Sequence, residues 1–326
     1  MSDRRLLIAA SPHLAPIDST PRIMWSVVAS LVPIIGASIW FFGPSALLVL
    51  AAATLGAVVS ERLFGKSESL WDGSAVITGL LLGLTLPAGL PLWMAFVGGA
   101  FGIGFGKIVF GGLGQNVFNP ALLGRAFLQA AFPVALTTFP AADAGWLTLR
   151  SNLALPFMSP VVTDAMTGAT PLGLLKFEQT GSQLSDLLLG STSGSLGETS
   201  GIVILIGGGY LALRNYLNWR IPVSLLATVA ILAGAIRLIG GDRYPDPLFM
   251  LFSGGLMLGA VYMATDMVTS PTTHRGSWIF GIGIGVLVVV IRIWGGLAEG
   301  VMYAILLMNA FVPFINRVTR PKVFGT

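Results

Sequence analysis

The chain contains no cysteine and few charged residues. Of its 326 residues only 10% are charged and two are histidines, whereas 54% are hydrophobic, with a mean hydropathy of +0.84. Soluble domains carry roughly 25% charged residues, so water is not the main solvent of this chain. The lack of cysteine excludes disulfides, thiolate-bound zinc and iron–sulfur ligation, and we expect no metal site. If a chain of this composition transfers electrons, it must therefore use an organic cofactor.

Apolar runs of membrane-spanning length follow one another along the chain. A helix needs roughly 17–25 apolar residues to cross a bilayer. The first run is too long for the apolar core of a signal peptide, so we expect it to remain as a helix. We predict an all-α polytopic membrane protein whose ten helices lie near 23–42, 44–60, 73–87, 91–110, 116–137, 200–214, 220–239, 247–265, 277–293 and 297–315.

The basic residues are scattered between these runs, which indicates membrane topology rather than nucleic-acid binding. With a cytoplasmic N-terminus, twelve Lys and Arg residues fall on the cytoplasmic side, Lys107 among them, and five fall outside. We therefore predict that both termini are cytoplasmic. The polar stretch 138–199 is then an extracytoplasmic loop between a first membrane unit, 1–137, and a second, 200–326.

A weak internal repeat relates the two membrane units. Residues 111–127 resemble residues 295–311, with Val117/Val301, Leu122/Leu306 and Leu123/Leu307 in register. Each unit has five predicted helices, and an odd number inverts the second unit relative to the first. We predict two inverted five-helix repeats.

Two glycine-rich runs, 102–106 and 281–285, lack the context of a nucleotide-binding loop. Neither is placed at a strand-to-helix turn, and Gly106-Lys107 is followed by Ile108 rather than Ser or Thr. Small residues let helices approach closely, so these runs favour helix packing.

Polar residues at membrane depth are candidates for function because burying them is costly. They are Gln115, Asn116, Asn119, Arg125, Asp266 and Glu299. Asn116 and Asn119 are three residues apart, which places them on one face if the segment is helical. Two such amides could hold a polar ligand, or could satisfy backbone that Pro120 leaves unpaired. For Arg125 and Asp266, ending a helix or reaching the interface is an equally good interpretation.

The most specific motif is in the predicted outer loop, where residues 164–171 read DAMTGATP. From physical chemistry alone, Gly168 and Pro171 predict a turn that exposes the Thr170 hydroxyl. The pattern also resembles the sequence at which a flavin transferase attaches FMN through its phosphate to a threonine. In that interpretation Asp164, Thr167, Gly168 and Ala169 are recognised and Thr170 is modified.

Nearly the whole chain resembles the D subunits of Rnf complexes, the ion-translocating ferredoxin:NAD oxidoreductases. The resemblance rests on residues 11–13 (SPH), 116–127 (NVFNPALLGRAF), the Thr170 motif and 264–269 (ATDMVT), where the family commonly has proline in place of Met267. The related B subunit of sodium-pumping NADH:quinone reductases is an alternative, but the short N-terminal region favours the Rnf family. An inverted-repeat transporter or channel, or a purely structural component, would leave the Thr170 motif unexplained.

The resemblance implies a flavoprotein subunit of a translocase in a bacterial or archaeal cytoplasmic membrane, inactive alone. It implies covalent FMN on Thr170, a non-covalent riboflavin near Asn116 and Asn119, and no catalytic side chain, because Thr170 is a tether. The implied partners are the A, B, C, E and G subunits of the Rnf complex, the flavin transferase and the lipid bilayer.

Overall fold

The computed structural model describes residues 18–65, 71–140, 151–156, 158, 170–178, 184–190, 192–198, 200–241 and 244–321. These residues are mainly helical and include no β-strand. The helices that are long and apolar enough to cross a membrane are α1 (Thr20–Phe42), α2 (Pro44–Phe64), α10 (Arg220–Gly240), α13 (His274–Trp294) and α14 (Val301–Val318). Shorter apolar helices are α3 (Ser74–Leu84), α4 (Leu92–Ile103), which a π-helical turn extends to Ile108, and α9 (Gly201–Leu213). The predicted class, an all-α polytopic membrane protein, is confirmed.

Two predicted segments are not continuous helices. The fifth, expected at 116–137, begins at Pro120 as α5 (Pro120–Ala131) and breaks before α6 (Pro133–Thr137). Phe132 is non-helical at φ −134° and ψ 57°, because the residue before a proline is pushed out of the helical region. The eighth, expected at 247–265, divides into α11 (Pro247–Phe252), α12 (Leu256–Leu258) and a π-helical turn, Gly259–Met263. Extended Ser253 and Gly254, at φ 65°, make that interruption.

Glycines allow the helices to pack closely, as predicted for the two glycine-rich runs. Both runs lie inside helical segments. A Cβ on Gly102 would be 2.6 Å from the Pro120 carbonyl oxygen, and one on Gly285 would be 2.8 Å from Thr228 Cβ. Side chains at these positions would therefore force the neighbouring helix away.

The two membrane units pack in the same pairwise manner. α2 packs extensively on α4 and α10 on α13, while α4 packs on α5 and α13 on α14. Contacts of α1 with α9 and of α5 with α14 join the units. The predicted repeat of residues 111–127 and 295–311 includes the first part of α5 and of α14, and the inversion of the two units stays a prediction.

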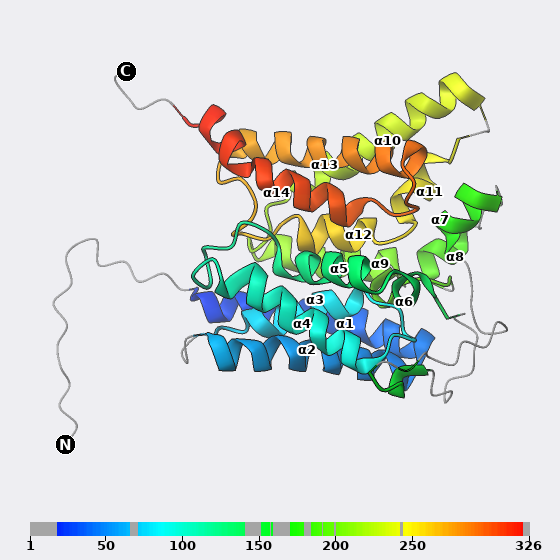
Figure 1. The fold of residues 1–326 in the computed structure, drawn as a ribbon. Helices are drawn as coiled ribbons and strands as arrows, with labels where there is room; N and C mark the ends of the chain where they lie inside the picture. Colours follow the sequence, from blue (N-terminus) through cyan, green and yellow to red (C-terminus); the bar gives the residue numbers. More distant parts are fainter. Residues whose placement is uncertain are drawn as a thin grey trace.

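The first turn of α1 and the last turn of α14 lie at the same end of the bundle, and α7 (Pro171–Gly173) and α8 (Leu184–Leu189) lie at the opposite end (Figure 1). The segment before α9 returns into the core. Leu196, fully buried in the 3₁₀ turn Leu196–Glu198, donates its N–H to the Leu86 carbonyl oxygen at 3.0 Å, and the Ser38 hydroxyl donates to the Leu196 carbonyl oxygen at 2.5 Å. We call the end with α7 and α8 the outer end, following the predicted topology, and the opposite end the inner end.

Candidate functional sites

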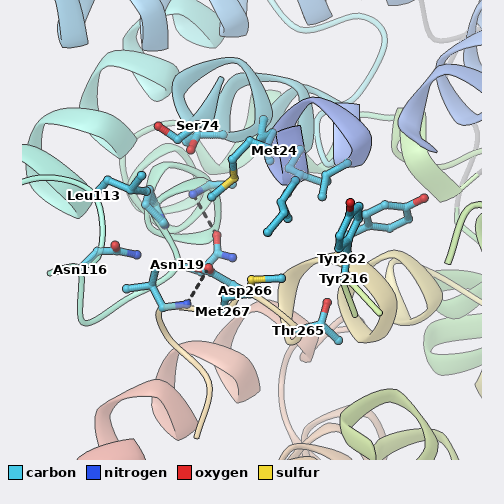
Figure 2. A pocket seen from close by; sticks show the side chains of 18 of the residues that line it. Met24, Ser74, Leu113, Asn116, Asn119, Tyr216, Tyr262, Thr265, Asp266 and Met267 are labelled. Atoms are coloured by element: carbon cyan, nitrogen blue, oxygen red, sulfur yellow. Dashed lines mark hydrogen bonds between the residues drawn. The ribbon is translucent and has the colours of Figure 1, made fainter. Parts of the chain in front are cut away.

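A cavity of about 860 Å³, including the space at its mouth, lies toward the inner end between the two units. Its polar lining includes Ser74, Asn116, Asn119, Tyr262 and Asp266, which surround it in Figure 2. We call it the inner cavity. The structure thus brings the two predicted asparagines to one site.

Asn119 has a structural role in the wall of this cavity. Its side-chain oxygen accepts hydrogen bonds from the N–H groups of Ala121 at 3.0 Å and Leu122 at 3.2 Å, so it caps the start of α5. Its amide nitrogen donates to the Met263 carbonyl oxygen at 3.2 Å, which ties α5 to the second unit. Pro120 occupies the first helical position, where a missing N–H has no cost. The expectation that Pro120 leaves an unpaired carbonyl in the middle of a helix is therefore wrong.

Asn116 lies in the irregular segment before α5, so the two asparagines do not share a helical face as predicted. Its side chain is 7% exposed, lines the inner cavity and has no hydrogen bond to any residue within the described ranges. A buried amide normally finds a partner. Asn116 therefore has more free hydrogen-bonding capacity toward a ligand than Asn119 has. Gln115, another candidate, is exposed to solvent.

A buried ion pair adjoins the inner cavity and was not predicted. Lys107, at the end of α4, bonds to the Glu61 carboxylate at the end of α2 and donates to the Ser74 hydroxyl at 2.5 Å. The side chains of Lys107 and Glu61 are only 4% and 1% exposed. Counting Lys107 as a solvent-facing topology charge was therefore wrong. Opposite charges at the ends of two apolar segments were the only signal in the sequence.

Asp266 also lines the inner cavity, in the loop that follows the Gly259–Met263 turn. It accepts hydrogen bonds from the Val268 N–H at 3.2 Å and the Thr269 hydroxyl at 3.1 Å. Burial raises the pKa of its carboxyl group, and these two hydrogen bonds partly oppose that shift. Asp266 thus shapes its own loop and is also a titratable group at the cavity.

A second cavity, which we call the outer cavity, contains about 820 Å³ of space including its mouth. Thr170, Arg125, Gln129 and Glu299 are among its lining residues. The Thr170 hydroxyl accepts a hydrogen bond from the Gly173 N–H at 3.1 Å and caps α7. The other predicted motif residues, Asp164, Thr167, Gly168 and Ala169, lie outside the described residues. Thr170 is thus among the residues that form the wall of this cavity.

Arg125 and Glu299 form an ion pair at the outer cavity. The guanidinium of Arg125 is 3.0 Å from a Glu299 carboxylate oxygen, and the side chains are 12% and 24% exposed. The Gly255 N–H donates to the other Glu299 oxygen at 2.9 Å. The alternative interpretation, in which Arg125 ends a helix or extends to the membrane surface, is therefore wrong. It links α5 of the first unit to the segment before α14.

The two cavities lie on opposite faces of one thin wall. Pro120 and Ala121 line the inner cavity, while Leu122 and Arg125 line the outer one. In the second unit Tyr262 faces the inner cavity and Met263 the outer one. The first turn of α5 and the Gly259–Met263 turn therefore form the wall, and the Asn119 to Met263 hydrogen bond fastens them together.

The fold defines a polytopic helical membrane protein with two cavities between its halves. The sequence model of the NQR2, RnfD, RnfE family matches residues 7–325. This chain belongs to that family.

The relatives include D subunits of ion-translocating complexes from several bacteria. That of the proton-translocating ferredoxin:NAD(+) oxidoreductase complex of Clostridium ljungdahlii is 42% identical, with 98% of this chain and 96% of that protein covered. That of the Na(+)-translocating ferredoxin:NAD(+) oxidoreductase complex of Acetobacterium woodii is 40% identical, covering 100% and 97%. That of the ion-translocating oxidoreductase complex of Stutzerimonas stutzeri is 42% identical, covering 94% and 93%. Similar identity to relatives named for different ions means that the likeness does not identify the coupling ion.

Proposed function

We propose that this chain is the D subunit of an Rnf-type ion-translocating ferredoxin:NAD oxidoreductase complex. Full-length similarity to the D subunits of such complexes is the observation that carries this proposal. The proposed partners are the A, B, C, E and G subunits and the flavin transferase that matures the chain. The protein transfers electrons within the complex and is inactive by itself.

We propose further that Thr170 holds FMN through a phosphoester and that the inner cavity holds riboflavin. The position of the Thr170 hydroxyl on the outer cavity supports the first site. The polar lining of the inner cavity and the buried amide of Asn116, which has no hydrogen bond within the described ranges, support the second. The flavins supply the redox chemistry when bound, and the protein sets their position and electrostatic surroundings. The role of Thr170 is that of a tether.

Fluorescence of the denatured chain in a gel tests the covalent site, because only a covalent flavin survives denaturation. We expect fluorescence from wild-type protein made together with the flavin transferase and none from Thr170→Ala. Thr137→Ala is a matched control, since Thr137 lines the same cavity and its hydroxyl bonds within its own helix. Thr167→Ala should weaken attachment at most. A fluorescent Thr170→Ala chain would place the flavin elsewhere.

We propose that the inner end of the bundle, with both termini, faces the cytoplasm of a bacterium or archaeon. The twelve-to-five distribution of Lys and Arg supports this orientation. Single cysteines can replace Phe177 at the outer end and Arg320 beyond α14, both of which are exposed. In intact cells a membrane-impermeant thiol reagent should label the Phe177→Cys chain and leave the Arg320→Cys chain unlabelled until lysis. The opposite pattern would reverse the orientation.

A further inference from the structure

Lys176 joins the segment that carries Thr170 to the end of α13. Its ammonium group is within hydrogen-bonding distance of four backbone carbonyl oxygens, those of Gly295 at 2.5 Å, Leu297 at 2.8 Å, Arg292 at 3.0 Å and Ile291 at 3.4 Å. An ammonium group has three N–H donors, so these acceptors can use all of them. The contacts connect Lys176 to backbone that lies 115 to 121 residues further along the chain.

The end of α13 needs a cation from outside the helix. The last carbonyl groups of a helix lack partners within it and lie at the negative end of its dipole, so a cation in the last turn often satisfies them. In α13 that cation is Arg292, but its guanidinium donates to the carbonyl oxygens of Met250 at 2.5 Å and Ser253 at 2.9 Å. These two carbonyl groups are at the end of α11. The end of α13 is therefore left to Lys176.

A short helical piece connects Lys176 to Thr170. α7 runs directly into a π-helical turn, Leu174–Glu178, which contains Lys176. The Thr170 carbonyl oxygen accepts a hydrogen bond from the Leu174 N–H at 2.9 Å, so Thr170 is bonded to the start of this turn. Six residues of helix rise only about 9 Å. A fixed Lys176 therefore limits where Thr170 can lie.

Leu172, between these two residues, gives the piece a second attachment. Its side chain is 5% exposed and belongs to an apolar cluster with Leu187 of α8 and Phe249 of α11. Burial of an apolar side chain is favourable but has no preferred direction. The hydrogen bonds of Lys176 are directional, so they select one orientation of the piece.

We propose that Lys176 is the anchor that holds Thr170 at the outer cavity, and hence a positioning residue for the flavin proposed there. The anchor itself rests on the contacts of Lys176, whereas its effect on a flavin rests on the proposed attachment to Thr170. Thr170 lines the outer cavity, whereas Lys176 lines a neighbouring cavity with Arg292 and Trp294. Lys176 therefore acts through the position of Thr170.

A nitroxide spin label at Thr170→Cys tests the anchor without any covalent flavin, in the full chain, which has no other cysteine. Electron paramagnetic resonance reports how freely the labelled residue moves. We expect an immobilised label in this parent chain and a more mobile one after Lys176→Met, because methionine cannot donate to the carbonyl oxygens. Lys176→Arg, which can donate, should keep most of the immobility.

The matched control is Arg317→Met, which removes a cation from the last turn of α14 at the inner end and should leave the label unchanged. Equal label mobility in Lys176→Met and its parent would overturn the anchor. A freely moving label in the parent would overturn it as well, so the test does not depend on whether Lys176→Met folds.

The effect on the flavin is tested on the full chain made together with the flavin transferase. Fluorescence in a denaturing gel gives the amount of covalent flavin. The anisotropy of that flavin is then measured on the native chain, after the emission of the matching Thr170→Ala chain is subtracted. We expect the anisotropy to fall in Lys176→Met and to be kept in Lys176→Arg.

Equal anisotropies in wild type and Lys176→Met would overturn the positioning of the flavin while leaving the anchor intact. Absence of covalent flavin from the wild-type chain would refute the proposed Thr170 site instead, and the spin label would still decide on the anchor.

Discussion

The inner and outer cavities have similar sizes but different polar walls. The inner cavity is framed by groups that the fold itself uses, namely the α5 cap at Asn119 and the nearly inaccessible Lys107–Glu61 pair. The charged pair of the outer cavity, Arg125–Glu299, is more exposed, and the Glu198 carboxyl group flanks Gly255 together with that of Glu299. The polar groups of the inner wall are therefore held by the fold, whereas the charged pair of the outer wall is more accessible.

The largest expected effect comes from breaking the inner ion pair. Lys107→Met leaves Glu61 buried without its cation, which should lower the free energy of unfolding by about 3–5 kcal/mol. Arg125→Met at the more exposed outer pair should cost only about 1–3 kcal/mol. Thermal unfolding of both variants in the same detergent measures the difference.

The double variant Lys107→Met with Glu61→Leu is the control. Removing both charges should restore most of the lost stability, because no uncompensated charge stays buried. Equal losses from Lys107→Met and Arg125→Met would mean that the two cavity walls do not differ as their burial indicates.

Smaller effects are expected at the two asparagines. Substitution of Asn116 should affect riboflavin binding, whereas substitution of Asn119 should also affect the stability of the fold. Asn116→Leu should weaken riboflavin binding about tenfold, because one hydrogen bond is lost and its partner on the ligand is left unsatisfied. The unfolding temperature should not change. Asn119→Leu should also lose the α5 cap, at a cost of about 0.5–2 kcal/mol. Acid-extractable riboflavin and the unfolding temperature are measured on the same preparations.

Asn119→Asp separates the capping of α5 from the hydrogen bond to Met263. Its carboxylate still caps α5 but cannot donate to the Met263 carbonyl oxygen. Covalent fluorescence at Thr170 should persist in every asparagine variant. Riboflavin release from a folded Asn116→Leu chain that matched wild type would return Asn116 to a packing role.

The sequence predicted the membrane spans and the location of the inner site. It predicted the exact helix boundaries less well. Apolar runs showed α1, α2, α10, α13 and α14 because length and composition alone define a membrane helix. Asn116 and Asn119 do meet at one cavity, yet the helix begins after them, since proline favours the first helical position. Apolar patterns within a segment therefore predicted the helix correctly, whereas the residue at which the helix begins or ends depended on local backbone geometry.

Contacts between distant segments could not be predicted. Lys107 and Glu61 are 46 residues apart, and nothing in either apolar run shows that the two helix ends meet. Glu198 lies in a polar stretch that was predicted to be outside the membrane, but its turn is hydrogen-bonded into the core through the Leu196 N–H and the Leu86 carbonyl oxygen. Tertiary packing determines which charged groups meet. The Lys107–Glu61 pair was therefore not predicted, and Arg125 and Glu299 were predicted as candidates but not as partners.

The wall fastened by Asn119 and Met263 has an electrical consequence. If both cavities hold flavins as proposed, an electron need cross only the first turn of α5 and the turn that faces it, and electrons tunnel through short lengths of packed protein. An ion needs a continuous polar path, and on the outer face Leu122 and Met263 present apolar side chains. With both proposed flavins in place, the wall would let electrons pass while its apolar side chains oppose ions, which would separate the two currents that a translocating oxidoreductase must couple.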